Sequence, residues 1–166
     1  MLSERILKAL NAQTNAEMAS AYLYLSMAAW FDAQSLRGCA GWMKAQAQEE
    51  LLHAMKFYGY IVERGGKVGF AAVEKPPAEW NSPRAVFEDV RAHEQKVTRM
   101  INELADLAAS ERDHATSGLL QWFIGEQVEE EANADDLVHK ITMVGASTHG
   151  LYLLDKELGA RKAGGD

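Results

Sequence analysis

Long runs of apolar residues at helical spacing restrict the fold of this 166-residue chain more than any other feature. Along each run, apolar side chains recur every three or four positions, which predicts helices with one face buried in a core. Four long helices are predicted, over about residues 3–31, 35–64, 82–110 and 113–144. A short fifth helix is predicted over about residues 147–158, before Gly159. The sequence therefore predicts an all-α fold.

Capping residues mark where the long helices begin. Pro83 stands directly after Ser82, and proline is favoured at the first helical position because a donor is not needed there. Serine and aspartate side chains accept hydrogen bonds from the free N–H groups of a first turn. The expected N-caps are Ser3, Ser35, Ser82 and Asp113.

The connections between the helices decide the topology. Helices one and two, and likewise three and four, are separated by about three residues, which predicts two antiparallel hairpins. Residues 65–82 are rich in glycine and proline and are expected to form a loop that can reach nearly ~60 Å. A helix of 30 residues is only about 45 Å long, so this loop can cross the bundle and leave helices two and three parallel. The expected result is one domain over residues 1–166, with a four-helix bundle over about 3–144.

Composition excludes several classes of protein. A net charge of -7 without a cluster of Lys and Arg argues against binding to nucleic acid. No apolar run approaches the ~18 residues that span a membrane, and no signal segment is evident at the N-terminus. A single cysteine, Cys39, leaves no internal disulfide and fits a reducing compartment. A cytoplasmic protein is predicted.

Acidic residues interrupt the apolar stripes at one level. Glu17, Glu50, Glu94 and Glu130 each stand near the middle of the inward face of a different long helix. His53 lies one turn after Glu50 and shares its face. Burying four ionised carboxylates together would offset most of the stability of a typical domain. Carboxylate oxygens with one imidazole form a suitable ligand set for divalent or trivalent cations, so a dinuclear metal site is predicted.

A less specific interpretation exists for each residue alone. A single glutamate on an apolar face is most often a surface or interface residue, and a single Glu-x-x-His occurs by chance in many helices. Four helices that each place an acid at the same level are difficult to explain in this way. The remaining alternative is a helical binding protein without a metal, in which the helix faces have been assigned incorrectly.

Other residues lie beside the predicted site. Tyr24 follows Glu17 on the same stripe. It is interpreted as a core aromatic whose hydroxyl bonds a carboxylate, as an electron donor near the metals, or as both. Glu131 is expected on a solvated face, Trp122 in the core, and the remaining histidines, His93 among them, at the surface or an interface. A third, more exposed metal position is predicted at Glu49, Glu126 and Glu129.

The sequence resembles the bacterial non-haem ferritins over nearly its whole length. The residues that carry the resemblance are Glu17 with Tyr24, the run Glu49-Glu50-Leu51-Leu52-His53, Glu94, and the run Trp122-Phe123-x-x-Glu126-Gln127-x-Glu129-Glu130. The resemblance implies a ferritin-like bundle and a hollow shell of 24 identical chains. Such a shell oxidises Fe(II) with dioxygen or peroxide and stores a ferric mineral.

The resemblance also implies a role for each residue. One iron ion would bind to Glu17, Glu50 and His53, and a second to Glu50, Glu94 and Glu130, with Glu50 bridging. Gln127 would form a neighbouring hydrogen bond, and Tyr24 would assist the reduction of oxygen. A third iron ion would bind to Glu49, Glu126, Glu129 and Glu130.

Departures from related families narrow the choice. The similar bacterioferritins have a second Glu-x-x-His and a methionine that binds haem, where this chain has Gln127, Glu130 and Leu51. Haem is therefore not expected. The leucines of the fifth helix have little to pack against in one bundle, which supports a cage. The main rival is a di-iron oxidase or peroxidase that acts on another substrate and stores no iron.

Overall fold

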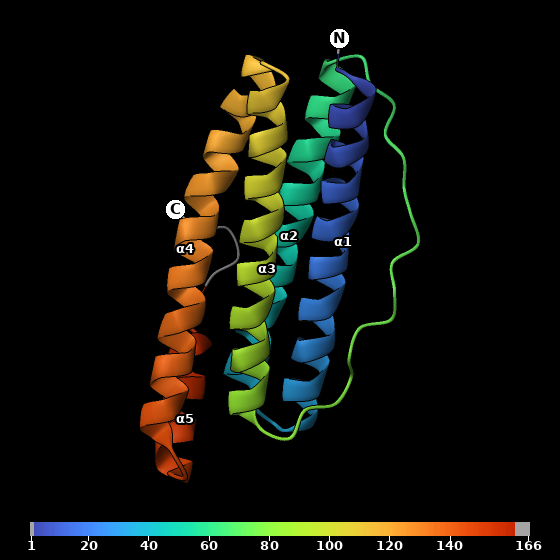
Figure 1. Cartoon of the computed structure of the whole chain (residues 1–166). Coiled ribbons are helices and arrows are strands. Elements are labelled where there is room, and N and C mark those ends of the chain that lie inside the picture. The colour runs from blue at the N-terminus through green and yellow to red at the C-terminus, as the bar shows by residue number, and fades with distance from the viewer. Residues whose placement is uncertain (1, 162–166) are drawn as a thin grey trace.

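Five helices and no strand make up the part of the chain described by the computed structural model, residues 2–161 (Figure 1). The chain is all-α, as predicted, and no described helix is long and apolar enough to cross a membrane. The helices are α1 (Glu4–Ala33), α2 (Arg37–Glu63), α3 (Pro83–Ser110), α4 (His114–Val144) and α5 (Thr148–Leu158).

Three of the four predicted caps are confirmed. The side chains of Ser3, Ser82 and Asp113 accept hydrogen bonds from backbone N–H groups in the first turns of α1, α3 and α4. The prediction for Ser35 is wrong. Ser35 has a φ of 61° in the tight turn after α1, and Leu36 is the N-cap of α2 without a side-chain hydrogen bond. The short connection requires a left-handed residue at position 35, so Ser35 cannot also cap α2.

A residue from α5 caps the first turn of α2 instead. The backbone N–H of Cys39 donates to Asp155 Oδ1 at 2.8 Å, and a carboxylate is favourable at this positive helix end. α5 approaches α2 so closely that a Cβ added to Gly38 would lie 1.7 Å from the backbone oxygen of Asp155. Gly38 therefore permits the contact between these two helices.

The topology also agrees with the prediction. α1 and α2 form one antiparallel pair, α3 and α4 form the other, and α2 and α3 run in the same direction (Figure 1). The crossover loop runs the length of the bundle beside α1 (Figure 1). Asn11 and Asn15 of α1 hold it through hydrogen bonds to the backbone of Lys67, Gly69 and Ala71.

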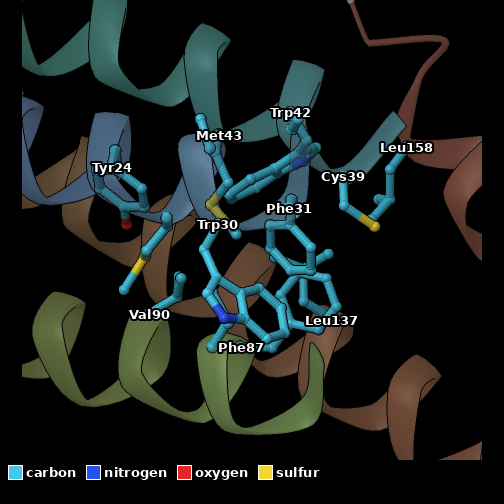
Figure 2. Close-up of a cluster of buried hydrophobic side chains, with 14 of the residues drawn as sticks. Tyr24, Trp30, Phe31, Cys39, Trp42, Met43, Phe87, Val90, Leu137 and Leu158 are labelled. Atoms are coloured by element: carbon cyan, nitrogen blue, oxygen red, sulfur yellow. The ribbon is translucent and has the colours of Figure 1, made fainter. Parts of the chain in front are cut away.

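Two apolar clusters occupy different ends of the bundle. One cluster contains Phe31 of α1 and Phe87 of α3, with ring centroids 5.5 Å apart, and it includes Leu158 of α5 (Figure 2). In the other, Phe57 of α2 and Phe123 of α4 stack with centroids 3.9 Å apart. Each large side chain removed from water contributes about 1.5–3 kcal/mol. On every long helix, the glutamate predicted to face inward lies between residues of these two clusters.

Candidate metal centre

A layer of buried polar side chains crosses the bundle between the two apolar clusters. Each long helix contributes to it, and all six inward-facing residues that the sequence singled out, His53 and Gln127 included, belong to it. We call this set the inner layer. Its members are Gln13, Glu17, Gln46, Glu50, His53, Glu94, Gln127 and Glu130.

Three side chains of the inner layer form a possible metal site. Glu17, Glu50 and His53 each offer a ligand atom, and these atoms lie within 4.8 Å of one another. Helical spacing places Glu50 and His53 on one face of α2, with His53 Nδ1 3.6 Å from Glu50 Oε2. Glu17 faces them from α1, and its buried Oε2 has no hydrogen-bond partner among the described residues. A buried carboxylate oxygen without a partner is costly, so a cation here would relieve that cost.

Glu94 and Glu130 join the inner layer through hydrogen bonds. The hydroxyl of Tyr24 donates to Glu94 Oε1, and Gln127 Nε2 lies 3.2 Å from Glu94 Oε2. Gln46 Nε2 donates to Glu130 Oε2 at 2.9 Å. In the described chain, neither glutamate belongs to the close group of three ligands, although both lie in the same layer.

Burial and mutual repulsion raise the pKa values of the inner carboxyls. Burial, and then the neighbouring Glu50, raise the pKa of Glu17 to about 8. Burial, and then Glu94, raise the pKa of Glu130 to about 7. Burial is also the main reason why the pKa of Glu94 is raised and that of Glu50 lies well above its ordinary value. These carboxyls can ionise together only when a cation replaces the protons.

The outer carboxylates, Glu49, Glu126 and Glu129, line a pocket of about 1080 Å³ beside the inner layer. His53 and Glu130 line the same pocket, so it connects the two groups. Glu126 Oε2 lies 3.8 Å from His53 Nε2. Glu49 Oε2 lies 2.6 Å from Nη2 of Arg161, and Glu129 is exposed. All three residues of the predicted third position therefore line one pocket.

The environments of Tyr24, Trp122 and His93 agree only partly with those predicted from the sequence. Tyr24 is fully buried and bonds a carboxylate, as its structural interpretation predicts. Trp122 is not a core residue, because it is 39% exposed and lines the pocket with its ring edge-on to His53. His93 is half-buried, bonds Ser20 at 2.8 Å and packs edge-on against Tyr24. Burial, and then Lys96, lower the pKa of His93 to about 4.

Two glutamines of the inner layer were not expected to take part. Gln13 Nε2 donates to Glu17 Oε1 at 2.7 Å, and Gln46 Nε2 donates to Glu50 Oε1 at 3.2 Å. Each glutamine stands four residues before its glutamate, a spacing that places side chains together on a helix. The sequence therefore contains a signal for both contacts. Arg161 has no such signal, because its contact with Glu49 depends on how α5 lies against α2.

Comparisons with known proteins support one family. A family model described as a ferritin-like domain matches residues 7–144. The chain is 43% identical to a protein of Bacteroides fragilis named bacterial non-heme ferritin, over 97% of this chain and 100% of that one. A Staphylococcus aureus protein of the same name is 42% identical, over 97% of each chain.

Solved structures give the same result. A structure described as a novel open pore ferritin from the hyperthermophilic archaeon Archaeoglobus fulgidus has a TM-score of 0.97 and 52% identity. That match covers 98% of this chain and 100% of the other. A structure described as a humanized archaeal ferritin has a TM-score of 0.98 and 49% identity, over 99% of this chain and 100% of the other.

Proposed function

Because this chain belongs to the ferritin-like family, we propose that its inner layer oxidises Fe(II) and that the ferric product is stored inside a shell of many copies. Iron storage with ferroxidase activity is the function that the family and the ferritin structures support. The buried carboxylate and imidazole ligands suit this function, because hard oxygen ligands favour Fe(III) over Fe(II).

The observation that carries this proposal is the group of Glu17, Glu50 and His53. Their ligand atoms lie within 4.8 Å of one another, and one oxygen of Glu17 lacks a hydrogen-bond partner in the described residues. Burial, and then the neighbouring Glu50, raise the carboxyl pKa of Glu17. An iron ion would bind to this oxygen, displace the protons and remove the cost of burial.

The remaining assignments follow the order of the residues in the inner layer. The first Fe(II) binds to Glu17, Glu50 and His53. The second binds to Glu94 and Glu130, with Glu50 shared between the two ions. Gln127 holds Glu94 in place through its side-chain amide. The hydroxyl of Tyr24 contacts Glu94 and can supply a proton or an electron. The outer carboxylates together with Glu130 form a third iron position.

Electron balance requires two Fe(II) ions for each oxidant molecule. Each ion loses one electron, and two electrons with two protons convert dioxygen to hydrogen peroxide, or hydrogen peroxide to water. Holding both ions beside the oxidant makes this reaction intramolecular and so accelerates it. The ligand set of one imidazole with carboxylates is asymmetric, which suits an ion that leaves as product rather than a permanent cofactor.

A hollow shell of 24 chains is the assembly that we propose for storage. α5 carries Tyr152 and Leu153, which are 63% and 50% exposed in the single chain. Exposed apolar side chains that lie together on one helix commonly pack against another chain. A cytoplasmic location and the lack of haem stay predictions from the sequence.

The variant Glu50→Ala tests the site directly. It removes the carboxylate that both iron ions share, so we expect the fast phase of Fe(II) oxidation to disappear while the shell still assembles. Stopped-flow absorbance of the ferric product measures the rate, and gel filtration measures the assembly. Glu63→Ala, an exposed position on the same helix, is the matched control. Fast oxidation that persists in Glu50→Ala contradicts the proposed site.

A further inference from the structure

Arg161 follows α5 and reaches back toward the metal centre. Its backbone N–H donates to the carbonyl oxygen of Leu158 at 3.2 Å, which fixes the turn after the helix. α5 is held in turn by the buried side chains of Leu154 and Leu158 and by the bond from Cys39 N–H to Asp155. The position of Arg161 is therefore set by the docking of α5 on α2.

The guanidinium of Arg161 contacts three side chains on one face of α2. It lies over the ring of Trp42, 4.5 Å from the ring centroid. Nη1 donates to Gln46 Oε1 at 3.0 Å, and Nη2 donates to Glu49 Oε2 at 2.6 Å. The side chains of Arg161 and Glu49 are only 22% and 17% exposed. A charge-assisted hydrogen bond of this length with little access to water is stronger than an ordinary surface ion pair.

The lysines that line the same pocket do not contact the outer carboxylates in this way. Lys56 Nζ lies over the ring of Trp122, 3.7 Å from its centroid. Lys140 pairs with Asp136 at 2.8 Å and with Glu157 at 2.6 Å. Arg161 thus differs from them in placing its charge on a residue of the proposed third iron position.

The contact with Gln46 extends the effect of Arg161 to the inner layer. Because the carbonyl oxygen of the Gln46 amide accepts from Arg161, its NH₂ group points the other way. That NH₂ group donates to Glu50 Oε1 at 3.2 Å and to Glu130 Oε2 at 2.9 Å. Arg161 therefore orients the amide that bonds two inner carboxyls.

We infer that Arg161 is the resident cation of the outer carboxylates and that a metal ion must displace it from Glu49 in order to bind there. This inference rests on the proposed function, in which Glu49 is an outer iron ligand. A guanidinium and a metal ion compete for Glu49 Oε2, because both are positive and repel each other at this distance. The ion pair therefore weakens the outer position and lets the inner layer fill first. When Arg161 leaves, the carbonyl oxygen of Gln46 loses its donor, and this change at an amide that also bonds Glu50 and Glu130 couples the two sites.

Calorimetric titration of the metal-free assembled protein with Zn²⁺ tests this inference without redox chemistry. In Arg161→Gln, we expect the affinity for the third ion to rise about tenfold, the change that loss of one charge-assisted hydrogen bond corresponds to. Arg161→Lys keeps the charge but not the planar fork, so it should show a smaller rise. Arg84→Gln removes a charge from an exposed ion pair with Glu88 on α3 and is the matched control.

The other possible results separate the displacement of Arg161 from the existence of the outer metal position. If Arg161→Gln binds the third ion as the wild type does, while Glu49→Gln binds it more weakly, the displacement is wrong and the outer position stands. If Glu49→Gln binds the third ion as tightly as the wild type, Glu49 is not a ligand and the displacement is again wrong. Neither result bears on the inner layer, whose test is the loss of fast oxidation in Glu50→Ala. Thermal unfolding of each variant reports whether the fold is intact.

Discussion

The inner layer and the outer carboxylates neutralise their acids by different means. In the inner layer, burial and repulsion raise the pKa of the carboxyls, to about 8 for Glu17 and about 7 for Glu130. Amide donors partly oppose this shift, such as Gln13 Nε2 at 2.7 Å from Glu17 Oε1. In the outer group, the guanidinium of Arg161 balances Glu49 at 2.6 Å. Without a metal ion, raised pKa values favour neutral carboxyls in the inner layer, whereas an ion pair neutralises Glu49 in the outer group.

This difference predicts how each site responds to a metal ion. Filling the inner layer replaces protons, so binding there depends on pH. Filling the outer group replaces a side chain, so binding there depends on the contact between α5 and α2. The inner carboxyls are buried, so their ionisation without a cation costs much free energy, whereas Glu129 is exposed and its ionisation costs little. The predictions below test this contrast.

The largest effect is expected from Glu17→Gln. The amide keeps the size of the side chain but replaces the carboxyl group, whose Oε2 has no partner in the described chain and could ionise to bind a cation. We expect the affinity for the first Zn²⁺ to fall at least about 100-fold. Loss of a residue that only hydrogen-bonds to a metal ligand usually lowers the affinity by less than this. Calorimetric titration measures it. A change of only a few-fold would mean that Glu17 is not a ligand.

Gly38→Ala should disturb the outer group from a distance. The added Cβ would lie 1.7 Å from the Asp155 oxygen, so α5 must shift, at a cost of about 1–3 kcal/mol in stability. Because Arg161 follows α5, its contact with Glu49 should weaken and the third Zn²⁺ should bind more tightly. Denaturant unfolding and calorimetry measure the two effects. Gly41→Ala, where a Cβ meets nothing within 4 Å, is the control and should change neither.

The metal-free protein should lose stability as the pH rises. The folded pKa values of Glu17 and Glu130, about 8 and about 7, exceed the ordinary 4.5, so the folded state holds more protons than the unfolded chain between these limits. The stability that they contribute is fully present below pH 4.5 and is lost as the pH rises through about 7 to 8. Thermal unfolding across this window should show a falling midpoint.

Glu17→Gln provides the comparison for that pH dependence. It removes the group with the pKa of about 8, so the midpoint should fall less steeply in the variant than in the wild type. Zn²⁺ should reduce the slope further, because it replaces the protons. Parallel slopes in the wild type and the variant would show that Glu17 does not hold an extra proton.

The smallest effect is expected from Glu129→Gln. An exposed carboxylate in water interacts weakly with its neighbours, by about 1 kcal/mol or less. We therefore expect the affinity for the third Zn²⁺ to fall by less than about tenfold, and the first two ions to bind as before. A loss of affinity as large as that expected for Glu17→Gln would contradict the difference between the inner layer and the outer carboxylates.

The sequence predicts the parts of this molecule that depend on regular helical spacing. Apolar stripes place the helices, loop lengths give the topology, and mid-stripe acids such as Glu94 and Glu130 identify the inner layer. The contacts of Gln13 and Gln46 follow the same spacing and could have been predicted. These features can be predicted because each depends on residues that are close together in the sequence.

Features that depend on tertiary contacts were not predicted. The tight turn forces Ser35 into a left-handed conformation, so α2 takes its cap from Asp155 of α5. Trp122 lies in the wall of the pocket, where it packs against Lys56 of α2, and His93 is half-buried because α1 packs over it through Ser20. The contact of Arg161 with Glu49 likewise depends on the docking of α5.

Gel filtration after oxidation tests the central claim most directly. The metal-free protein is mixed in air with Fe(II) far in excess of its inner and outer sites, and protein and iron are measured in each fraction. We predict that the iron elutes with a large assembly of the chain and exceeds what those sites can hold, and that Glu50→Ala retains much less over the same short time. Iron limited to the inner and outer sites, on a small oligomer, would contradict storage and indicate a di-iron enzyme with another substrate.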